Sequence, residues 1–178
     1  MSSVFLSKSS ALLRPSETTT ITATAKDANG NTITGHTVTW NNSNSSVASM
    51  ATNGAAATLT ASVLGTTSLT ATVDQVTSQA ASITVTNSFP TSLGVTVGPG
   101  GSYSFDPAQA DIGAGATVTF TWAGGVTHNL TWLTTPSPTP PNSGDMSSGS
   151  VQVTLNTPGT YNYHCTIHAG MDGSITVH

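Results

Sequence analysis

Hydrophobic and polar residues alternate with a period of two along most of the chain. In the first half, alternating stretches predict strands over residues 18–27, 36–40, 55–62, 66–73 and 80–86. Asn29-Gly30 favours a tight turn after the first of these strands, and the polar run at 41–46 predicts a loop. Five or more short strands at this spacing are typical of a β-sandwich.

The second half repeats this pattern after an interruption around Pro90, which predicts a short linker between two domains, residues 1–88 and 89–178. Residues 134–150 are rich in Pro and Ser and predict a long, poorly ordered connection, either a solvated loop or a flap that docks a partner. The strands predicted in this half are residues 93–98, 102–107, 116–123, 128–133, 150–155, 159–165 and 173–178.

The composition strengthens the all-β prediction. Thr and Val are abundant, whereas charged residues make up only 6% of the chain, so the strong helix formers Glu, Lys and Arg are nearly absent. The formal net charge is −4, and all charged side chains after residue 90 are aspartates. Such an acidic, Lys-poor surface excludes binding to a phosphate backbone, so we expect no nucleic-acid partner.

Three features of the sequence indicate where the protein is located. No apolar run reaches the length of a transmembrane segment, and residues 1–10 lack the apolar core of a signal peptide. A surface rich in Thr and Ser is typical of periplasmic and cell-surface modules. We therefore expect an extracytoplasmic protein (periplasmic, secreted or on the cell surface) whose signal peptide is absent from this sequence.

The single cysteine of the chain lies near the C-terminus. Strand alternation places Tyr161, Tyr163 and Cys165 on one face, which we expect to point inward, and His164 on the other. His168 and Met171 follow on a tight loop that can fold back over Cys165. One thiolate, two imidazoles and a weak axial thioether form the ligand set of a blue-copper site, so a second histidine is needed.

His128 is the best candidate for this second histidine. His36 lies in the other predicted domain, His164 faces away from Cys165, and His178 is the last residue, whereas His128 begins a strand that can neighbour the cysteine strand. Each residue also has a simpler interpretation, since a buried Cys or Met is commonly core filling and a His can cap a loop. The combination of all four favours metal binding.

The sequence argues against several enzymes. It has no His-x-His pair, as a multicopper oxidase requires, only one cysteine, where a binuclear copper site requires two, and no order of residues that suggests hydrolysis. A structural zinc site would favour four His or Cys ligands without a thioether. We therefore expect a protein that is not an enzyme.

Residues 93–178 resemble a cupredoxin of the plastocyanin/amicyanin type, through "HNLTW" and the motif Cys-x-x-His-x-x-Met. The resemblance implies a Greek-key sandwich that binds one copper ion through His128, Cys165, His168 and Met171. It also implies that the backbone N–H of Asn129 donates to the Cys165 sulfur, and that the Asn129 side chain ties the ligand loops together.

Residues 3–86 resemble a bacterial Ig-like domain of group 2, through "VTWNNSNSSVASM", "GAAATLTAS" and "GTTSLTATV". This resemblance implies a disulfide-free sandwich with Trp40 in its core, which serves as a spacer or adhesive module. Together the two halves predict an electron-transfer protein with a type 1 copper centre that cycles between Cu(I) and Cu(II) and serves a redox partner protein. The alternative is a copper-handling or adhesion module whose copper does not transfer electrons.

Overall fold

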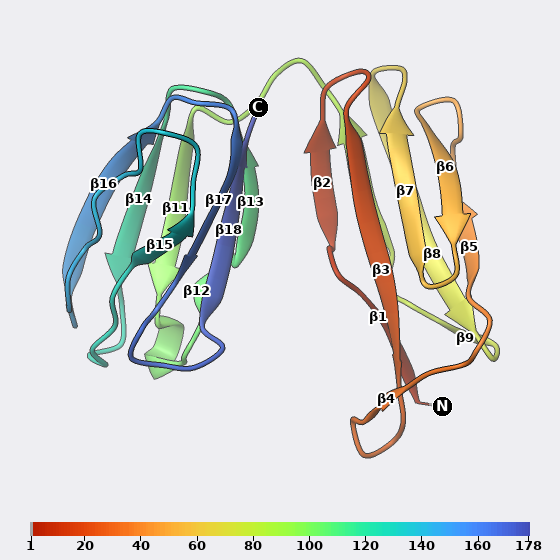
Figure 1. The fold of residues 1–178 in the computed structure, drawn as a ribbon, viewed down its shortest axis with the longest axis horizontal. Coiled ribbons are helices and arrows are strands. Elements are labelled where there is room, and N and C mark those ends of the chain that lie inside the picture. Colours follow the sequence, from red (N-terminus) through yellow and green to blue (C-terminus); the bar gives the residue numbers. More distant parts are fainter. Residues whose placement is uncertain (1) are drawn as a thin grey trace. The chain divides into compact units, whose positions relative to one another are not determined.

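The computed structural model describes residues 2–178 and consists almost entirely of β-strands (Figure 1). Its only helical element in this range is a short 3₁₀ turn, Pro99–Gly101. The all-β prediction is therefore confirmed. No helix among the described residues is long and apolar enough to cross a membrane. The chain separates into two compact units, Met1–Asn87 and Ser88–His178.

The N-terminal unit contains two sheets. One has the order β1-β3-β7-β6 with β4 paired to β3, and the other has the order β2-β10-β8-β5 with β9 paired to β8. Only β2 and β10 run parallel. The strands are β1 (Ser3–Leu6), β2 (Ser10–Leu13), β3 (Thr18–Lys26), β4 (Thr32–Ile33), β5 (Thr39–Asn42), β6 (Ala48–Asn53), β7 (Ala56–Ala61), β8 (Gly65–Val73), β9 (Val76–Thr77) and β10 (Ala81–Val85).

Alternation along these strands separates a small aliphatic core from a hydroxyl-rich surface. Ile21, Leu59 and Ile83 are fully buried, whereas outward-facing Thr20 and Thr58 on neighbouring strands hydrogen-bond to each other at 3.0 Å. Trp40 is only partly buried on the edge strand β5, where its indole N–H donates to Gly54 O at 3.1 Å. The expected core tryptophan is therefore a rim residue.

The sequence pattern missed five strands of this unit, β1, β2, β4, β6 and β9. These strands are short, and β1 and β6 lie at the edge of their sheet, so only one neighbour stabilises them and their alternation is weak. The pattern also placed one strand too early: residues 36–38 are outside β5, and Asn41 and Asn42, assigned to a loop, belong to it.

The C-terminal unit also contains two sheets, with the orders β12-β11-β14-β16 and β13-β18-β17-β15. The pairs β11/β14 and β13/β18 are parallel. The strands are β11 (Ser92–Val97), β12 (Phe105–Asp106), β13 (Gln109–Ile112), β14 (Ala116–Trp122), β15 (Thr131–Thr134), β16 (Gly149–Leu155), β17 (Gly159–His164) and β18 (Asp172–Val177).

An aromatic core holds these two sheets together. Tyr163 lies at its centre, with ring centroids of Phe105, Phe120 and Trp132 at 4.9, 5.3 and 5.4 Å, all in edge-to-face contact. Gly173, opposite Tyr163 on β18, leaves room for this ring, because a Cβ at position 173 would overlap it. The core therefore fixes the strand β17 that leads to Cys165.

Two predictions for this unit were wrong in detail. β13 was missed because it has only four residues and pairs solely with β18. Residues 102–104, predicted as a strand, instead continue the turn that starts at Pro99, because Gly98, Gly100 and Gly101 adopt left-handed backbone angles. The strand is reduced to Phe105 and Asp106, and the preceding turn is free to approach the opposite loops.

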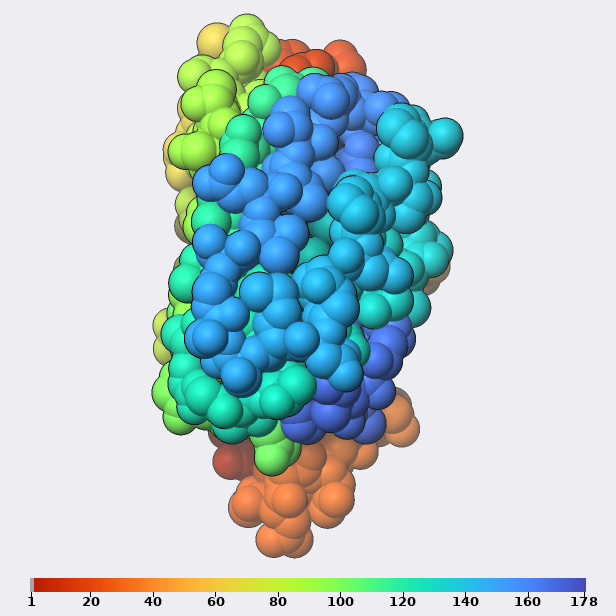
Figure 2. Space-filling view, turned by 90° about the vertical axis from the view of Figure 1, so that its left-hand side faces the viewer, coloured from red at the N-terminus to blue at the C-terminus, as the bar shows by residue number. Residues whose placement is uncertain are grey.

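The Pro/Ser-rich segment between β15 and β16, residues 135–148, is held against the unit rather than loosely ordered as expected (Figure 2, light blue). The backbone N–H groups of Leu130 and Trp132 donate to the side chains of Ser143 and Asn142, at 2.8 and 3.1 Å. The indole N–H of Trp132 donates to Pro141 O at 3.1 Å. This segment therefore lies beside residues 128–132 along their length.

Candidate metal centre

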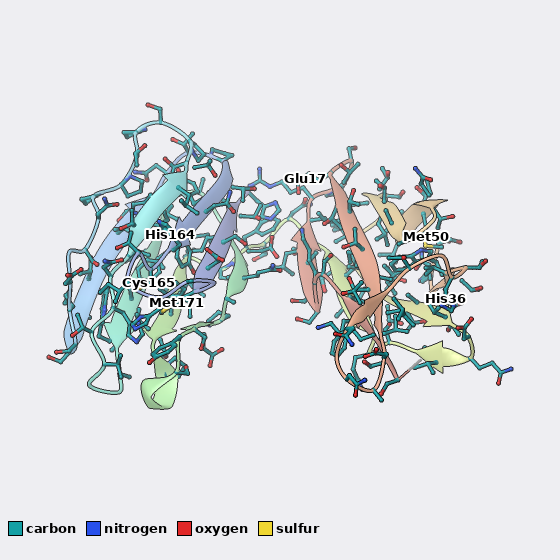
Figure 3. All side chains as sticks on the ribbon, turned by 60° about the horizontal axis from the view of Figure 1, so that its bottom comes forward. Glu17, His36, Met50, His164, Cys165 and Met171 are labelled. Atoms are coloured by element: carbon teal, nitrogen blue, oxygen red, sulfur yellow. The ribbon has the colours of Figure 1, made fainter. Side chains whose placement is uncertain are left out.

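The strand β17 delivers Cys165 to one end of the C-terminal unit. Tyr161, Tyr163 and Cys165 are buried, whereas Asn162 and His164 are half-buried, as strand alternation predicted. The chain then turns through residues 166–170 and returns. Cys165 N–H donates to Met171 O at 3.0 Å, which closes the turn and brings Met171, 1% exposed, beside the cysteine (Figure 3).

His128 is the most buried polar residue of the site, at 1% exposure. It precedes β15 and pairs as an isolated bridge with Met146, through two backbone hydrogen bonds of 2.8 Å. The indole N–H of Trp122 also donates to His128 O at 3.0 Å. The backbone of His128 is therefore held by the Pro/Ser-rich segment and by the end of β14.

Three ligand atoms converge at this point. His128 Nδ1 lies 3.0 Å from His168 Nδ1, and the Cys165 sulfur lies 3.9 and 3.7 Å from these two atoms. Ligand atoms that share one small ion at about 2.0–2.3 Å lie roughly 3–4 Å from one another. Within residues 2–178, this is the one group of three or more His, Cys, Asp or Glu side chains arranged to hold a metal ion.

Asn129 connects the loops that carry these ligands. Its backbone N–H donates to the Cys165 sulfur at 3.5 Å, the hydrogen bond that the family resemblance implies. Its side-chain oxygen accepts from Thr166 N–H at 2.9 Å, and its side-chain nitrogen lies 2.7 Å from Thr166 Oγ1 and 2.8 Å from Asp145 Oδ1. Asn129 is 7% exposed, so the burial of its amide is compensated on both sides.

Burial, and secondly the nearby His168, lowers the pKa of His128. The imidazole therefore stays neutral at neutral pH, which is the form that coordinates a metal. One thiol and two imidazoles in a site this dry match the donor preferences of copper. The residues present thus fit a copper ion.

Two residues at the site went unnoticed in the sequence. Tyr103, 62% exposed, stacks on the His168 ring with centroids 4.1 Å apart and planes 10° apart. Gly98 lies against His128, since a Cβ at position 98 would come within 2.5 Å of His128 Nε2. Both belong to the turn before β12, which the pattern had assigned to a strand, so no local signal pointed to them.

The remaining histidines lie elsewhere. His36 pairs with Asp74 at 2.7 Å in the N-terminal unit. His178 is buried, stacks on Phe89 and lies 2.9 Å from Asp111 Oδ1. His164 is on the outer face of β17. Met146, which we expected not to bind metal, packs against the aromatic core.

Comparison with known proteins agrees with this site. Residues 92–178 match the model of the copper-binding proteins of the plastocyanin/azurin family. No curated protein shows significant sequence similarity to the chain.

Several solved structures are similar to the chain. A purple cupredoxin from Nitrosopumilus maritimus is 24% identical over 48% of this chain and 99% of its own, with a TM-score of 0.43. Oxidised plastocyanin from Dryopteris crassirhizoma is 30% identical over 48% of this chain and 99% of its own, with a TM-score of 0.39. A copper-containing nitrite reductase from Thermus scotoductus SA-01 is 15% identical over 71% of this chain and 47% of its own, with a TM-score of 0.42.

The copper-type donor set and the match to the family model meet in the same part of the chain, residues 92–178, which is therefore a copper-binding cupredoxin domain.

Proposed function

We propose that the protein is an electron carrier with one type 1 copper ion, held by His128, Cys165, His168 and Met171. The observation that carries this proposal is the convergence of two imidazole nitrogens on one buried thiol that also accepts the Asn129 N–H. When bound, copper supplies a one-electron couple between Cu(I) and Cu(II). In this proposal the protein is not an enzyme.

The protein's own contribution is a rigid, dry pocket. The loop from Cys165 to Met171 is closed by a backbone hydrogen bond, and His128 is fixed by Met146 and Trp122. Ligands held this way keep their positions when the charge at the site changes, so little reorganisation opposes electron transfer. The N–H of Asn129 on the sulfur stabilises the thiolate and so tunes the potential.

We propose that electrons pass through the His168 ring, which is only half-buried, to a redox partner protein. Around it, Gly124, Gly125, Ala169 and Gly170 are exposed and uncharged. Tyr103 and Ile167, 62% and 44% exposed, add apolar surface beside the ring. A small neutral surface of this kind suits brief docking of a redox partner.

For the N-terminal unit, we propose an Ig-like spacer that holds the copper unit away from an extracytoplasmic surface. Its two sheets, its aliphatic core and its Thr-rich exterior support a structural role. A fragment of residues 88–178 should then show the same copper spectrum and reduction potential as the full chain. A changed potential in the fragment would contradict the spacer role.

The test of the copper centre is reconstitution with Cu(II). The full chain should bind one ion per chain and develop an intense visible thiolate-to-copper band that bleaches reversibly on reduction. Cys165→Ser should abolish the band. His164→Ala should retain it, because His164 is next to Cys165 in the sequence but lies outside the ligand group. A colourless copper complex, or one that releases its ion readily to a chelator, would contradict the proposal.

A further inference from the structure

Asp145 stands out because it is an exposed carboxylate on the Pro/Ser-rich segment, and yet it contacts the centre of the site. Its Oδ1 accepts a hydrogen bond of 2.8 Å from the Asn129 side chain. The next residue, Met146, makes both backbone hydrogen bonds to His128. Two consecutive residues of the segment thus hold two consecutive residues of the site.

We propose that Asp145 is a positioning residue for the copper centre, acting through Asn129 on the sulfur of Cys165. This inference rests on the proposed type 1 copper function. Asn129 links the segment directly to the Cys165 sulfur, because its side chain contacts Asp145 and Thr166 while its backbone N–H contacts the sulfur.

The hydrogen bonds around Asn129 explain why a carboxylate suits this position. The amide nitrogen of Asn129 has two protons, and its partners are Thr166 Oγ1 and Asp145 Oδ1. Thr166 N–H already donates to the amide oxygen, which fixes the orientation of the amide group. A charged acceptor for the second proton makes a stronger hydrogen bond than a neutral one and restrains the Asn129 backbone, and hence its N–H, against the sulfur.

Asp145 also places a negative charge near the site. A nearby negative charge favours the more positively charged Cu(II) state, so its removal should raise the reduction potential. Asp172, the exposed residue after Met171, offers a matched control, because it carries the same charge at the site without a hydrogen bond to Asn129. Any effect shared by both positions is electrostatic, and the difference between the two positions measures positioning.

The first experiment uses metal-free full-length protein and follows hydrogen exchange of the Asn129 backbone amide by NMR. Asp145→Ala should accelerate exchange about tenfold, the equivalent of one charge-assisted hydrogen bond of about 1.4 kcal/mol. Asp172→Ala should leave it unchanged, and Asp145→Asn, which keeps a neutral acceptor, should restore most of the protection. Unchanged exchange in Asp145→Ala would overturn the proposal.

The second experiment measures the reduction potential of the copper-loaded variants. Asp145→Ala should raise the potential less than Asp172→Ala, because a weaker N–H···S hydrogen bond favours Cu(II) and offsets the effect of the lost charge. The difference should be up to a tenfold change in the relative affinities of Cu(I) and Cu(II), or about 59 mV. Equal shifts of the potential in the two variants would mean that Asp145 acts only as an ordinary surface charge. Failure of the copper function itself would appear separately, as a wild-type protein without a thiolate band but with the predicted exchange pattern.

Discussion

The two units of the molecule share an architecture of two β-sheets but differ in what they bury. The N-terminal core is built from Ala, Val, Leu and Ile, and the polar side chains that it buries are the hydroxyl residues Thr19, Thr67 and Ser78. The C-terminal core is aromatic, and it also buries His128, Asn129, Cys165 and His178. Burial of polar groups is costly unless they are paired, and the histidines and the thiol that are buried among the described residues all lie in the C-terminal unit, which marks where function resides.

The difference also lies in how the loops are held. In the C-terminal unit, the turn at Gly98, the His128 loop and the Cys165 loop meet at one end of the unit (Figure 1), where hydrogen bonds from Asn129 and Met146 tie them together. The aliphatic unit also ties its loops by side-chain hydrogen bonds, such as Thr67 with Asn42 and Asn44, but within residues 2–178 only the aromatic unit brings metal-ligating side chains together at the ends of its strands.

Phe120→Ala should have the largest effect on this comparison. Phe120 is fully buried against Tyr163 and Trp132, so its truncation should cost about 3–5 kcal/mol of unfolding free energy. The copper band should melt at markedly lower temperature. Leu59→Ala, a comparable deletion in the N-terminal core, should lower the stability of its own unit and leave melting of the copper band unchanged; a shift in that band would show that the units are coupled.

Gly98→Ala should come next, through displacement of the His128 ring. The added Cβ would lie 2.5 Å from Nε2, and relieving such overpacking typically costs 1–3 kcal/mol, so copper affinity should fall by about tenfold or more. Gly100→Ala is the matched control, because Gly100 has nearly the same φ, 62° against 66°, with no heavy atom near its Cβ position. Copper affinity is measured by competition titration. Equal losses of affinity in the two variants would show that the effect comes from backbone strain.

The contrast between the units also explains what the sequence could predict. Alternation alone gave the all-β class and the inward direction of Tyr161, Tyr163 and Cys165, because the side-chain period of a strand is a local property. The sequence also pointed to Cys165, His168 and Met171 as candidate ligands, since the three lie within seven residues. His128 required only the elimination of three other histidines, since His168 was already a candidate ligand.

What the sequence could not show depends on contacts between distant segments. Tyr103 stacks on His168 across 65 positions. Gly98 faces His128 from the turn before β12, a strand of two residues where the pattern suggested residues 102–107. Asp145 lies in a Pro/Ser-rich stretch whose composition predicts disorder, yet backbone hydrogen bonds to residues 128–132 fix it in place. Composition does not report such partners.

Tyr103→Leu should have a smaller effect, confined to the exposed side of the site. An aromatic stack contributes about 0.5–1.5 kcal/mol beyond the area that it buries, so the His168 ring should become more mobile and copper affinity should fall by up to about tenfold. NMR line widths and shifts of the His168 ring protons measure the mobility. Tyr103→Phe keeps the stack, and a Phe variant as mobile as the Leu variant would assign the effect to the hydroxyl.

The smallest effects should come from removing single hydroxyls in the aromatic core. The Tyr163 hydroxyl is buried without a hydrogen-bond partner among the described residues, and burial raises the pKa of Tyr163 above its ordinary value, so the group stays protonated at neutral pH. Tyr163→Phe should therefore raise the unfolding free energy by roughly 1 kcal/mol.

Tyr161 offers the opposite case, because its hydroxyl donates to Thr157 O at 3.0 Å, and Tyr161→Phe should lower the unfolding free energy by about the same amount. Urea unfolding of both variants measures the two signs. A loss of stability in Tyr163→Phe would mean that a bound water satisfies its hydroxyl, and the aromatic core would then be better hydrated than the aliphatic one.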